Sequence, residues 1–175
     1  MIQSDIKKIV EDLIETFLDA GKISLDLRKK GLTKEIKSDN TPVSNGDLEV
    51  NKILTKKIKE LTPNIPIVSE ETSENKSREN LEDFWLIDPI DGTYDYINDL
   101  DEFTINAGLI IQKKPAAGLI YAPAKNRMFY SYGDNLSFEL IDGKPIKLDH
   151  SKNFDKNEIK FVSYSNKIKP EISDI

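Results

Sequence analysis

The chain has 175 residues, of which 38% are hydrophobic and 32% are charged, and its formal net charge is −6. This size allows one ordinary domain with a small surplus, and the acidic balance disfavours nucleic acid polymers and anionic membranes as partners. The absence of cysteine excludes disulfides, zinc–thiolate sites and a cysteine nucleophile, and it fits a cytoplasmic location. The first residues carry no secretory signal, and no apolar run approaches the roughly 18 residues that span a bilayer.

Two amphipathic helices are expected in the first third of the chain. Apolar residues recur every three or four positions after Asp5, so a helix is predicted that Ser4 or Asp5 caps and Gly31 ends. The elements that follow are a short strand at 35–37, a loop at 39–46 and a helix at 46–61 that Pro63 closes. The side chains expected to face inward from this second helix are Leu48, Ile53, Leu54, Ile58 and Leu61.

From residue 65 onward the hydrophobic period becomes that of strands. Short apolar runs predict strands at 65–69, 84–90, 103–111, 116–121, 127–132 and 137–141. The pair Asp142-Gly143 predicts a hairpin turn, and the polar residues 72–80 predict an exposed loop. Two helices followed by a run of adjacent strands predict an α+β domain with helices packed on a mostly antiparallel sheet.

A second domain is expected to begin near the end of the chain. We expect residues 1–150 to form a metal- and phosphate-binding α+β domain and residues 151–175 to open a truncated α/β domain. A strand is predicted at 160–164, but the eleven residues after it are too few for a crossover helix and a returning strand. A domain cut in this way would expose sheet surface, so a homo-oligomer or other self-association is expected. His150 is the only histidine and is expected to be exposed in a polar loop.

The strongest chemical signal is the segment Asp-Pro-Ile-Asp-Gly-Thr that begins at Asp88, directly after an apolar run. Pro89 and Gly92 favour a turn, in which the carboxylates of Asp88 and Asp91 and the carbonyl of Ile90 can converge. Three hard oxygen donors suit Mg²⁺ or Mn²⁺. The alternative is an ordinary turn with solvated acids, which the apolar run leading into the pair disfavours.

The same segment also predicts a phosphate site. The amides of Gly92 and Thr93 would begin a short helix near 94–97, and the first turn of a helix offers unpaired N–H groups to an anion. An anionic substrate needs such local donors here, because the chain as a whole is acidic.

Two further acidic positions are candidates for the same site. Ser69-Glu70-Glu71 follows the strand predicted at 65–69, and Glu70 is expected to bind metal beside Asp88 while Glu71 faces away. The alternative for this pair is two exposed acids that open a polar loop.

The third acidic position is Asp47, which allows two interpretations. Ser44 and Asp47 fit a helix capping box, a purely structural role. Asp47 could instead orient a hydroxyl, that of Thr93, which holds an attacking water molecule. Together with Glu70, Asp88 and Asp91 it would place four negative charges in one cleft, an arrangement that divalent ions would stabilise.

These three motifs, in this order, resemble the inositol monophosphatase superfamily. Segments 101–106 and 118–124 are most similar to its 3'(2'),5'-bisphosphate nucleotidases of the CysQ type. The resemblance implies a layered α-β-α-β-α sandwich in two domains and two or three Mg²⁺ ions, with Mn²⁺ as a substitute and Li⁺ as an inhibitor. The implied substrate is a small phosphorylated molecule, adenosine 3',5'-bisphosphate, which loses its 3'-phosphate in sulfur metabolism.

The resemblance also implies roles for individual residues. Glu70, Asp88 and the carbonyl of Ile90 would hold one metal ion, and Asp88 and Asp91 would share a second. Asp47 and Thr93, with Glu70, would serve catalysis by positioning the water nucleophile. The residues implied to bind the phosphate of the substrate are Gly92, Thr93 and Asp91.

Two alternatives to the nucleotidase interpretation stay open. The first is a phosphatase of the inositol monophosphatase type. The second is a fragment that binds metal or phosphate without turnover, because family members are longer and their second domain supplies an aspartate from a Trp-Asp motif that this sequence lacks.

Overall fold

The computed structural model describes residues 2–37, 41–71 and 81–149. Its helices are α1 (Gln3–Lys30), α2 (Asn45–Leu61) and α3 (Thr93–Ile97), with a 3₁₀ turn η2 (Pro123–Lys125). Its strands are β1 (Lys34–Ile36), β2 (Pro42–Ser44), β3 (Ile67–Ser69), β4 (Phe84–Asp91), β5 (Thr104–Ile111), β6 (Lys114–Ala122), β7 (Arg127–Tyr132), β8 (Ser137–Ile141) and β9 (Lys144–Lys147). The expected loop at 72–80, His150 and the expected second domain lie outside the described residues.

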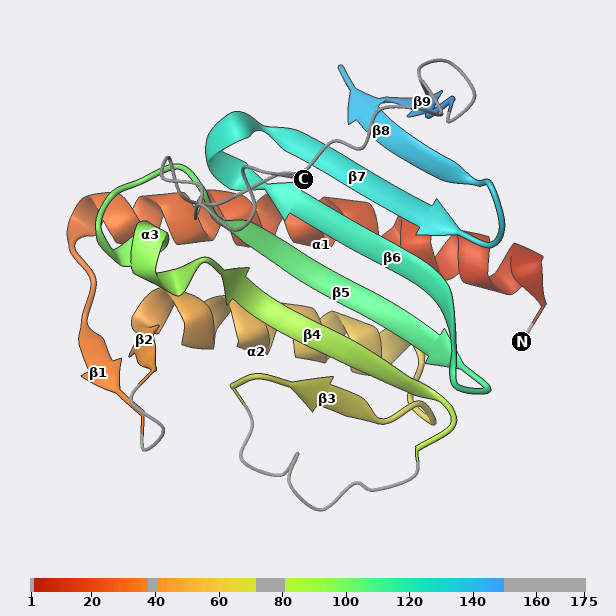
Figure 1. Ribbon diagram of the computed structural model, residues 1–175, viewed down its shortest axis with the longest axis horizontal. Coiled ribbons are helices and arrows are strands. Elements are labelled where there is room, and N and C mark those ends of the chain that lie inside the picture. Colours follow the sequence, from red (N-terminus) through yellow and green to blue (C-terminus); the bar gives the residue numbers. More distant parts are fainter. Residues whose placement is uncertain (1, 38–40, 72–80, 150–175) are drawn as a thin grey trace, which may run out of the picture.

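The main sheet of the described residues has seven strands (Figure 1). Its strands follow chain order from β3 to β9, and every neighbouring pair is antiparallel except β3 and β4, which run parallel. Strands β1 and β2 form a separate two-stranded sheet. The prediction of an α+β fold with a mostly antiparallel sheet is therefore confirmed.

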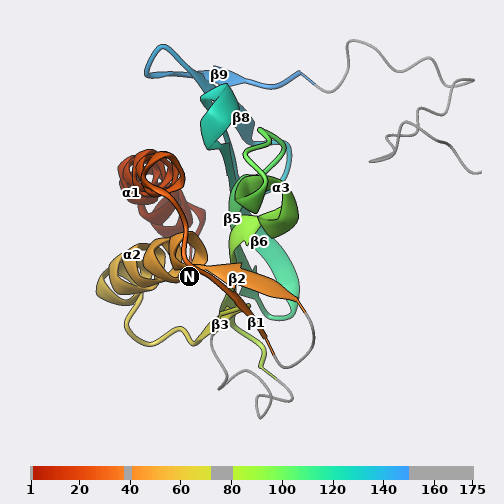
Figure 2. The same cartoon turned by 90° about the vertical axis from the view of Figure 1, so that its left-hand side faces the viewer.

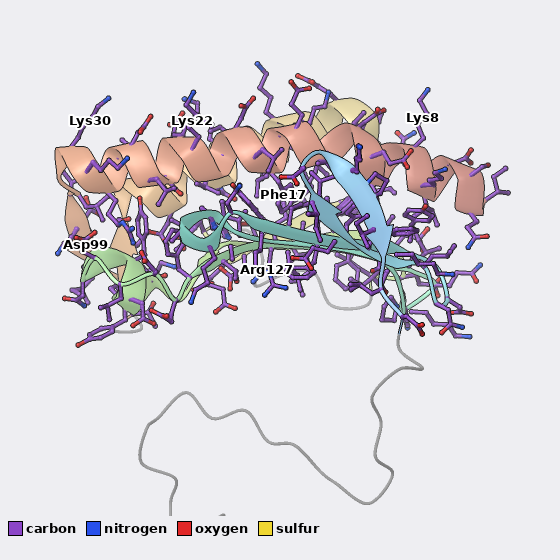
Figure 3. All side chains as sticks on the ribbon, turned by 90° about the horizontal axis from the view of Figure 1, so that it is seen from above. Lys8, Phe17, Lys22, Lys30, Asp99 and Arg127 are labelled. Carbon is purple, nitrogen blue, oxygen red and sulfur yellow. The ribbon has the colours of Figure 1, made fainter. Side chains whose placement is uncertain are left out.

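Both long helices lie on the same face of the sheet, as Figure 2 shows. Val10, Leu13 and Phe17 of α1 are buried, because residues three and four positions apart share one side of a helix. In Figure 3 Phe17 points from α1 toward the sheet, whereas Lys8 and other lysines of this helix point to solvent. No helix among the described residues is both long and apolar enough to cross a membrane.

The strands alternate between the covered face and the open face. Trp85 and Ile87 of β4 are buried beneath the helices, whereas Leu86 between them is 52% exposed on the other face. Successive strand residues point to opposite faces, so every strand contributes to both. Neither α1 nor α2 covers the open face, which we call the outer face; it is defined by Leu86, Asp88, Asn106, Ile120 and the residues in line with them.

The start of α1 corrects one expectation. The helix begins at Gln3 with Ile2 in the N-cap position, so neither Ser4 nor Asp5 is the cap. The Asp5 carboxylate instead lies in the first turn, where it accepts a hydrogen bond from the Ile2 amide at 3.4 Å. The expected end is confirmed: Gly31 has a φ of 96°, which glycine adopts without a steric penalty.

The segment before α2 and the inner face of α2 also differ from expectation. Residues 42–44, expected in a loop, form β2, because their backbone pairs with β1 in antiparallel register. Leu48, expected to face inward, is 51% exposed. The prediction is confirmed for Leu54 and Ile58, which are buried together with Asp47 and Val50. Leu48 lies about 100° around the helix from Asp47.

Candidate functional site

The end of β4 brings Asp88 and Asp91 to the same face by a β-bulge. In a regular strand, residues three apart point to opposite faces. Here Asp88 pairs with Asn106 of β5 and Asp91 pairs with Thr104, and the register shifts between the two pairs. The extra residue of a bulge turns the second carboxylate to the outer face, beside the first. The carboxylates of Asp88 and Asp91 therefore share the outer face, and a bulge brings them there rather than a turn that ends the strand.

Gly92 connects this bulge to α3 without an intervening loop. Its φ of 92° and ψ of 37° lie in the left-handed region. A Cβ atom on this residue would also lie 2.6 Å from the Glu102 carbonyl oxygen. Only glycine meets both conditions without strain, so the backbone can pass from Asp91 directly into the first turn of α3 at Thr93.

Asp47 joins the start of α2 to the start of α3. Its side chain is buried, with 1% of the residue exposed. One carboxylate oxygen accepts hydrogen bonds from the Ser44 amide at 2.9 Å and the Ser44 hydroxyl at 2.6 Å, which confirms the capping box. The other oxygen lies 3.1 Å from the Thr93 hydroxyl. The capping role and the contact with Thr93 therefore hold at the same time.

The Thr93 hydroxyl also lies 2.9 Å from the Ile90 carbonyl oxygen. The hydroxyl has one hydrogen and two acceptors within reach, so it can donate to either Asp47 or Ile90. When it donates to one of them, its lone pairs are free to accept a hydrogen bond from a third group. This arrangement fits a hydroxyl that orients a water molecule.

Parallel pairing of β3 with β4 places Glu70 beside Asp88. Ser69 is opposite Ile87, and the Glu70 amide donates to the Ile87 carbonyl at 3.1 Å. Burial raises the pKa of Asp88 to about 7, and the negative charges of Glu70, Asp91 and Asp47 add to the increase. The other three acids of the predicted site therefore all act electrostatically on Asp88.

Lys37 is a site residue that the sequence analysis did not single out. Its ammonium lies 2.7 Å from a Glu71 oxygen and 3.7 Å from a Glu70 oxygen. The Glu71 side chain is only 5% exposed and the Glu70 side chain is 49% exposed, so Glu71 is not one of two solvated acids. Burial alone would lower the pKa of Lys37, but the bond to Glu71 and the surrounding acids raise it.

The chemistry of this cluster fits a divalent cation. Its donors are carboxylate oxygens and the Ile90 carbonyl, and hard oxygen donors are what Mg²⁺ binds. One carboxylate oxygen of Asp88 is buried and has no hydrogen-bond partner, and an uncompensated charge in such a place is unfavourable. Within the described ranges, no three carboxylate or imidazole groups already stand as ligands around one point. Binding would therefore require rotation of side chains, for which half-exposed Glu70 has room.

Comparison with known proteins identifies the family. The sequence profile of the inositol monophosphatase family matches residues 5–172. The chain belongs to this family. A 3'(2'),5'-bisphosphate nucleotidase CysQ from Aggregatibacter actinomycetemcomitans is 35% identical over 142 residues, which are 80% of this chain and 53% of that protein. The CysQ of Haemophilus influenzae is 36% identical over 144 residues, 81% of this chain and 51% of the relative.

The chain thus spans about half the length of the curated relatives it matches. Among solved structures, an inositol monophosphatase/NADP phosphatase in complex with Mg²⁺ and phosphate has a TM-score of 0.65 at 20% identity, covering 77% of this chain and 51% of that one. This likeness confirms the fold predicted from the sequence.

Proposed function

We propose that this chain forms the cation- and phosphate-binding half of a divalent-metal-dependent phosphomonoesterase. The observation that carries the proposal is the outer-face cluster, in which a buried Asp88 oxygen has no partner and the pKa of the Asp88 carboxyl is raised by burial and by the charges of Glu70 and Asp91. A structural role would not require several acids to share one poorly solvated position, because that arrangement lowers stability in the absence of a cation.

The proposed ligands follow from the positions of these oxygens. Glu70, Asp88 and the Ile90 carbonyl would hold one ion, and Asp88 and Asp91 would share a second. When bound, such ions supply positive charge to the leaving oxygen and lower the pKa of water. Two or three Mg²⁺ ions are proposed, with Mn²⁺ as a functional substitute and Li⁺ as an inhibitor.

The remaining residues are proposed to position the reactants. The Thr93 hydroxyl, 3.1 Å from Asp47, would hold the attacking water in line with the phosphorus atom. Asp47 is fixed by Ser44 and would hold Thr93 in the required rotamer. The amides of Gly92 and Thr93, with Asp91 acting through a shared cation, would bind the phosphate.

The proposed substrate is adenosine 3',5'-bisphosphate, from which the 3'-phosphate would be removed. Identity of 35% and 36% to two CysQ nucleotidases supports this choice over inositol phosphates. An inositol monophosphatase activity is the second candidate, supported by the family to which the chain belongs. A fragment that binds metal and phosphate without turnover is the third, because the chain spans only about half of its relatives.

Phosphate release distinguishes the three candidates. The 175-residue chain and the full-length Haemophilus influenzae relative would be assayed in parallel with adenosine 3',5'-bisphosphate and inositol 1-phosphate in Mg²⁺. Preference for the nucleotide supports the proposal, and preference for the inositol ester favours the second candidate. Binding of Mg²⁺ without release by the short chain, beside turnover by the relative, identifies the third.

A second measurement tests the cation site directly. Isothermal titration of the 175-residue chain with Mg²⁺ should show uptake that Asp91→Asn weakens by more than about tenfold. Absence of uptake by the wild-type chain would contradict the proposal. The domain boundary near residue 150 stays a prediction, and limited proteolysis that leaves a stable product ending close to it would support it.

A further inference from the structure

Two buried oxygen atoms on the outer face have no hydrogen-bond partner, and they belong to a cross-strand pair. In the described part of the chain, Asp88 Oδ1 and Asn106 Oδ1 are the buried side-chain polar atoms without a partner. Asp88 of β4 and Asn106 of β5 are directly opposite each other in the antiparallel register. Side chains of such a pair point to the same face, with Cβ atoms about 5 Å apart.

The orientation of the Asn106 amide follows from its contact with Asp91. The Asn106 Nδ2 group donates to Asp91 Oδ2 at 3.2 Å. A carboxylate can only accept, so exchanging the oxygen and nitrogen of Asn106 would place two acceptors against each other. The oxygen of Asn106 is therefore the atom that lacks a partner, and it is an acceptor.

Two unpartnered acceptors on directly opposed residues indicate an electropositive group as their ligand. Leaving a buried acceptor unsatisfied costs about 1–3 kcal/mol. A neutral donor such as a hydroxyl would satisfy the oxygen atoms but would leave the charges of Asp88 and Asp91 uncompensated, because Lys37 lies against Glu70 and Glu71 instead. A cation satisfies both requirements, and Mg²⁺ and Ca²⁺ accept amide oxygens as ligands alongside carboxylates.

We propose that Asn106 is a further residue of the cation site, with two distinct roles. Its amide nitrogen holds Asp91 in position, and its Oδ1 atom supplies a neutral oxygen to the cation that Asp88 binds. The inference rests on the proposed cation site and extends it to β5. It also accounts for a polar side chain between Ile105 and Ala107 in β5, whose other residues are apolar apart from Thr104 at its start.

Asn106→Leu removes both roles while it keeps the branching at Cγ and the number of side-chain heavy atoms. We expect the affinity for Mg²⁺ and Mn²⁺, measured by isothermal titration, to fall about 10- to 100-fold, the usual effect of losing a supporting group at a metal site. In EDTA the variant should melt at the same or a higher temperature than the wild type, because an unsatisfied buried oxygen has been removed. The increase in melting temperature on adding Mg²⁺ should be smaller than in the wild type.

A lower affinity for Mg²⁺ together with an equal or higher melting temperature in EDTA distinguishes a cation ligand from a structural residue. A residue needed only for the sheet would lower the melting temperature in EDTA and leave the increment from Mg²⁺ unchanged, and that result would overturn the inference. Ser131→Ala on β7 removes a polar group from the same face outside the cluster and should leave both quantities unchanged. If Asn106→Leu does not fold, Asn106→Ala is measured in the same way.

The outcomes also distinguish this inference from the proposed function. Loss of Mg²⁺ uptake in Asp91→Asn together with wild-type affinity in Asn106→Leu overturns the role of Asn106 and leaves the cation site intact. No uptake by the wild-type chain overturns the proposed function and, with it, the role of Asn106.

Discussion

The two faces of the seven-stranded sheet differ in what covers them and in what their side chains do. The face beneath α1 and α2 is apolar and buried over the middle strands, with Trp85, Leu109 and Leu119 at 0% exposure, whereas β8 and β9 at the edge of the sheet are partly or fully exposed. The outer face carries Asp88, Asn106 and, through the bulge, Asp91. Because strand residues alternate, one strand serves both purposes. Stability and chemistry are therefore expected to respond to different substitutions within the same strand.

The largest expected effect is at the covered face. Trp85→Ala removes a fully buried ring whose Nε1 group donates to the Thr62 hydroxyl at 3.0 Å, so it should lower the free energy of unfolding by about 3–5 kcal/mol. Its neighbour Leu86 is half-exposed on the outer face, and Leu86→Ala should cost less than about 0.5 kcal/mol. Urea unfolding followed by circular dichroism measures both. Similar losses in the two variants would contradict the division between faces.

The next effect is expected at the contact between α2 and α3, beside Asp47 and Thr93. Tyr96 of α3 is buried and donates to the Ser24 carbonyl at 2.7 Å, while a Cβ on Gly46 would lie 2.3 Å from the Tyr96 hydroxyl oxygen. Gly46→Ala should therefore cost about 1–3 kcal/mol and separate Thr93 from Asp47.

Thermal melting and Mg²⁺ titration check this expectation. Gly118→Ala is the matched control, because its added carbon would lie 3.5 Å from the Ser131 hydroxyl oxygen, an ordinary contact. Equal melting temperatures for the Gly46 and Gly118 variants would show that the close approach of α3 to α2 is not required.

A smaller effect is expected from pH in the absence of metal. The pKa of Asp88 is raised from 3.8 to about 7, so this residue favours the folded state below pH 4 and loses that contribution as pH rises through about 7. In EDTA, Asp88→Asn should match the wild type near pH 4 and exceed it by about 1 kcal/mol at pH 8. Melting curves across this range test the sign. A wild-type protein that gains stability relative to Asp88→Asn as pH rises would contradict it.

The smallest effect on folding is expected from the apolar residues of the outer face. Leu86 and Ile120 are about half exposed there, and exposed apolar surface promotes association. We expect the 175-residue chain to self-associate in sedimentation velocity experiments. The double variant Leu86→Lys, Ile120→Lys should be monomeric with a free energy of unfolding within about 0.5 kcal/mol of the wild type. A monodisperse wild-type monomer would contradict this expectation.

Local patterns predicted most of the elements. The apolar stripe of α1 and the short apolar runs of β4, β5 and β7 give element bounds within three residues, because helices and strands bury one side at periods of 3.6 and 2. The hairpin turn predicted at Asp142-Gly143 is confirmed by the antiparallel pairing of β8 and β9 on either side of it. No bounds were predicted for β9, since its four residues are all exposed. Strand β2 was also missed, since its three residues lie in a segment rich in turn-favouring residues and become a strand only by pairing with β1.

In the candidate site, too, some features can be predicted from local sequence and others cannot. The sequence by itself determined which acids are available, since Asp47, Glu70, Asp88 and Asp91 stand at the ends of recognisable elements and hard oxygens indicate a hard cation. It could not determine that a bulge turns Asp91 to the face of Asp88, because a bulge is defined by the register of two strands.

Only the tertiary structure decided the partners of these acids. Lys37 and Asn106 enter the site through contacts with Glu71 and Asp91, which are 34 and 15 positions away in sequence. Such contacts depend on which strands are neighbours and on how their registers align. The periodicity of apolar residues indicates which side of a helix or strand is buried. It contains no information on which polar group of another element will lie opposite a given side chain.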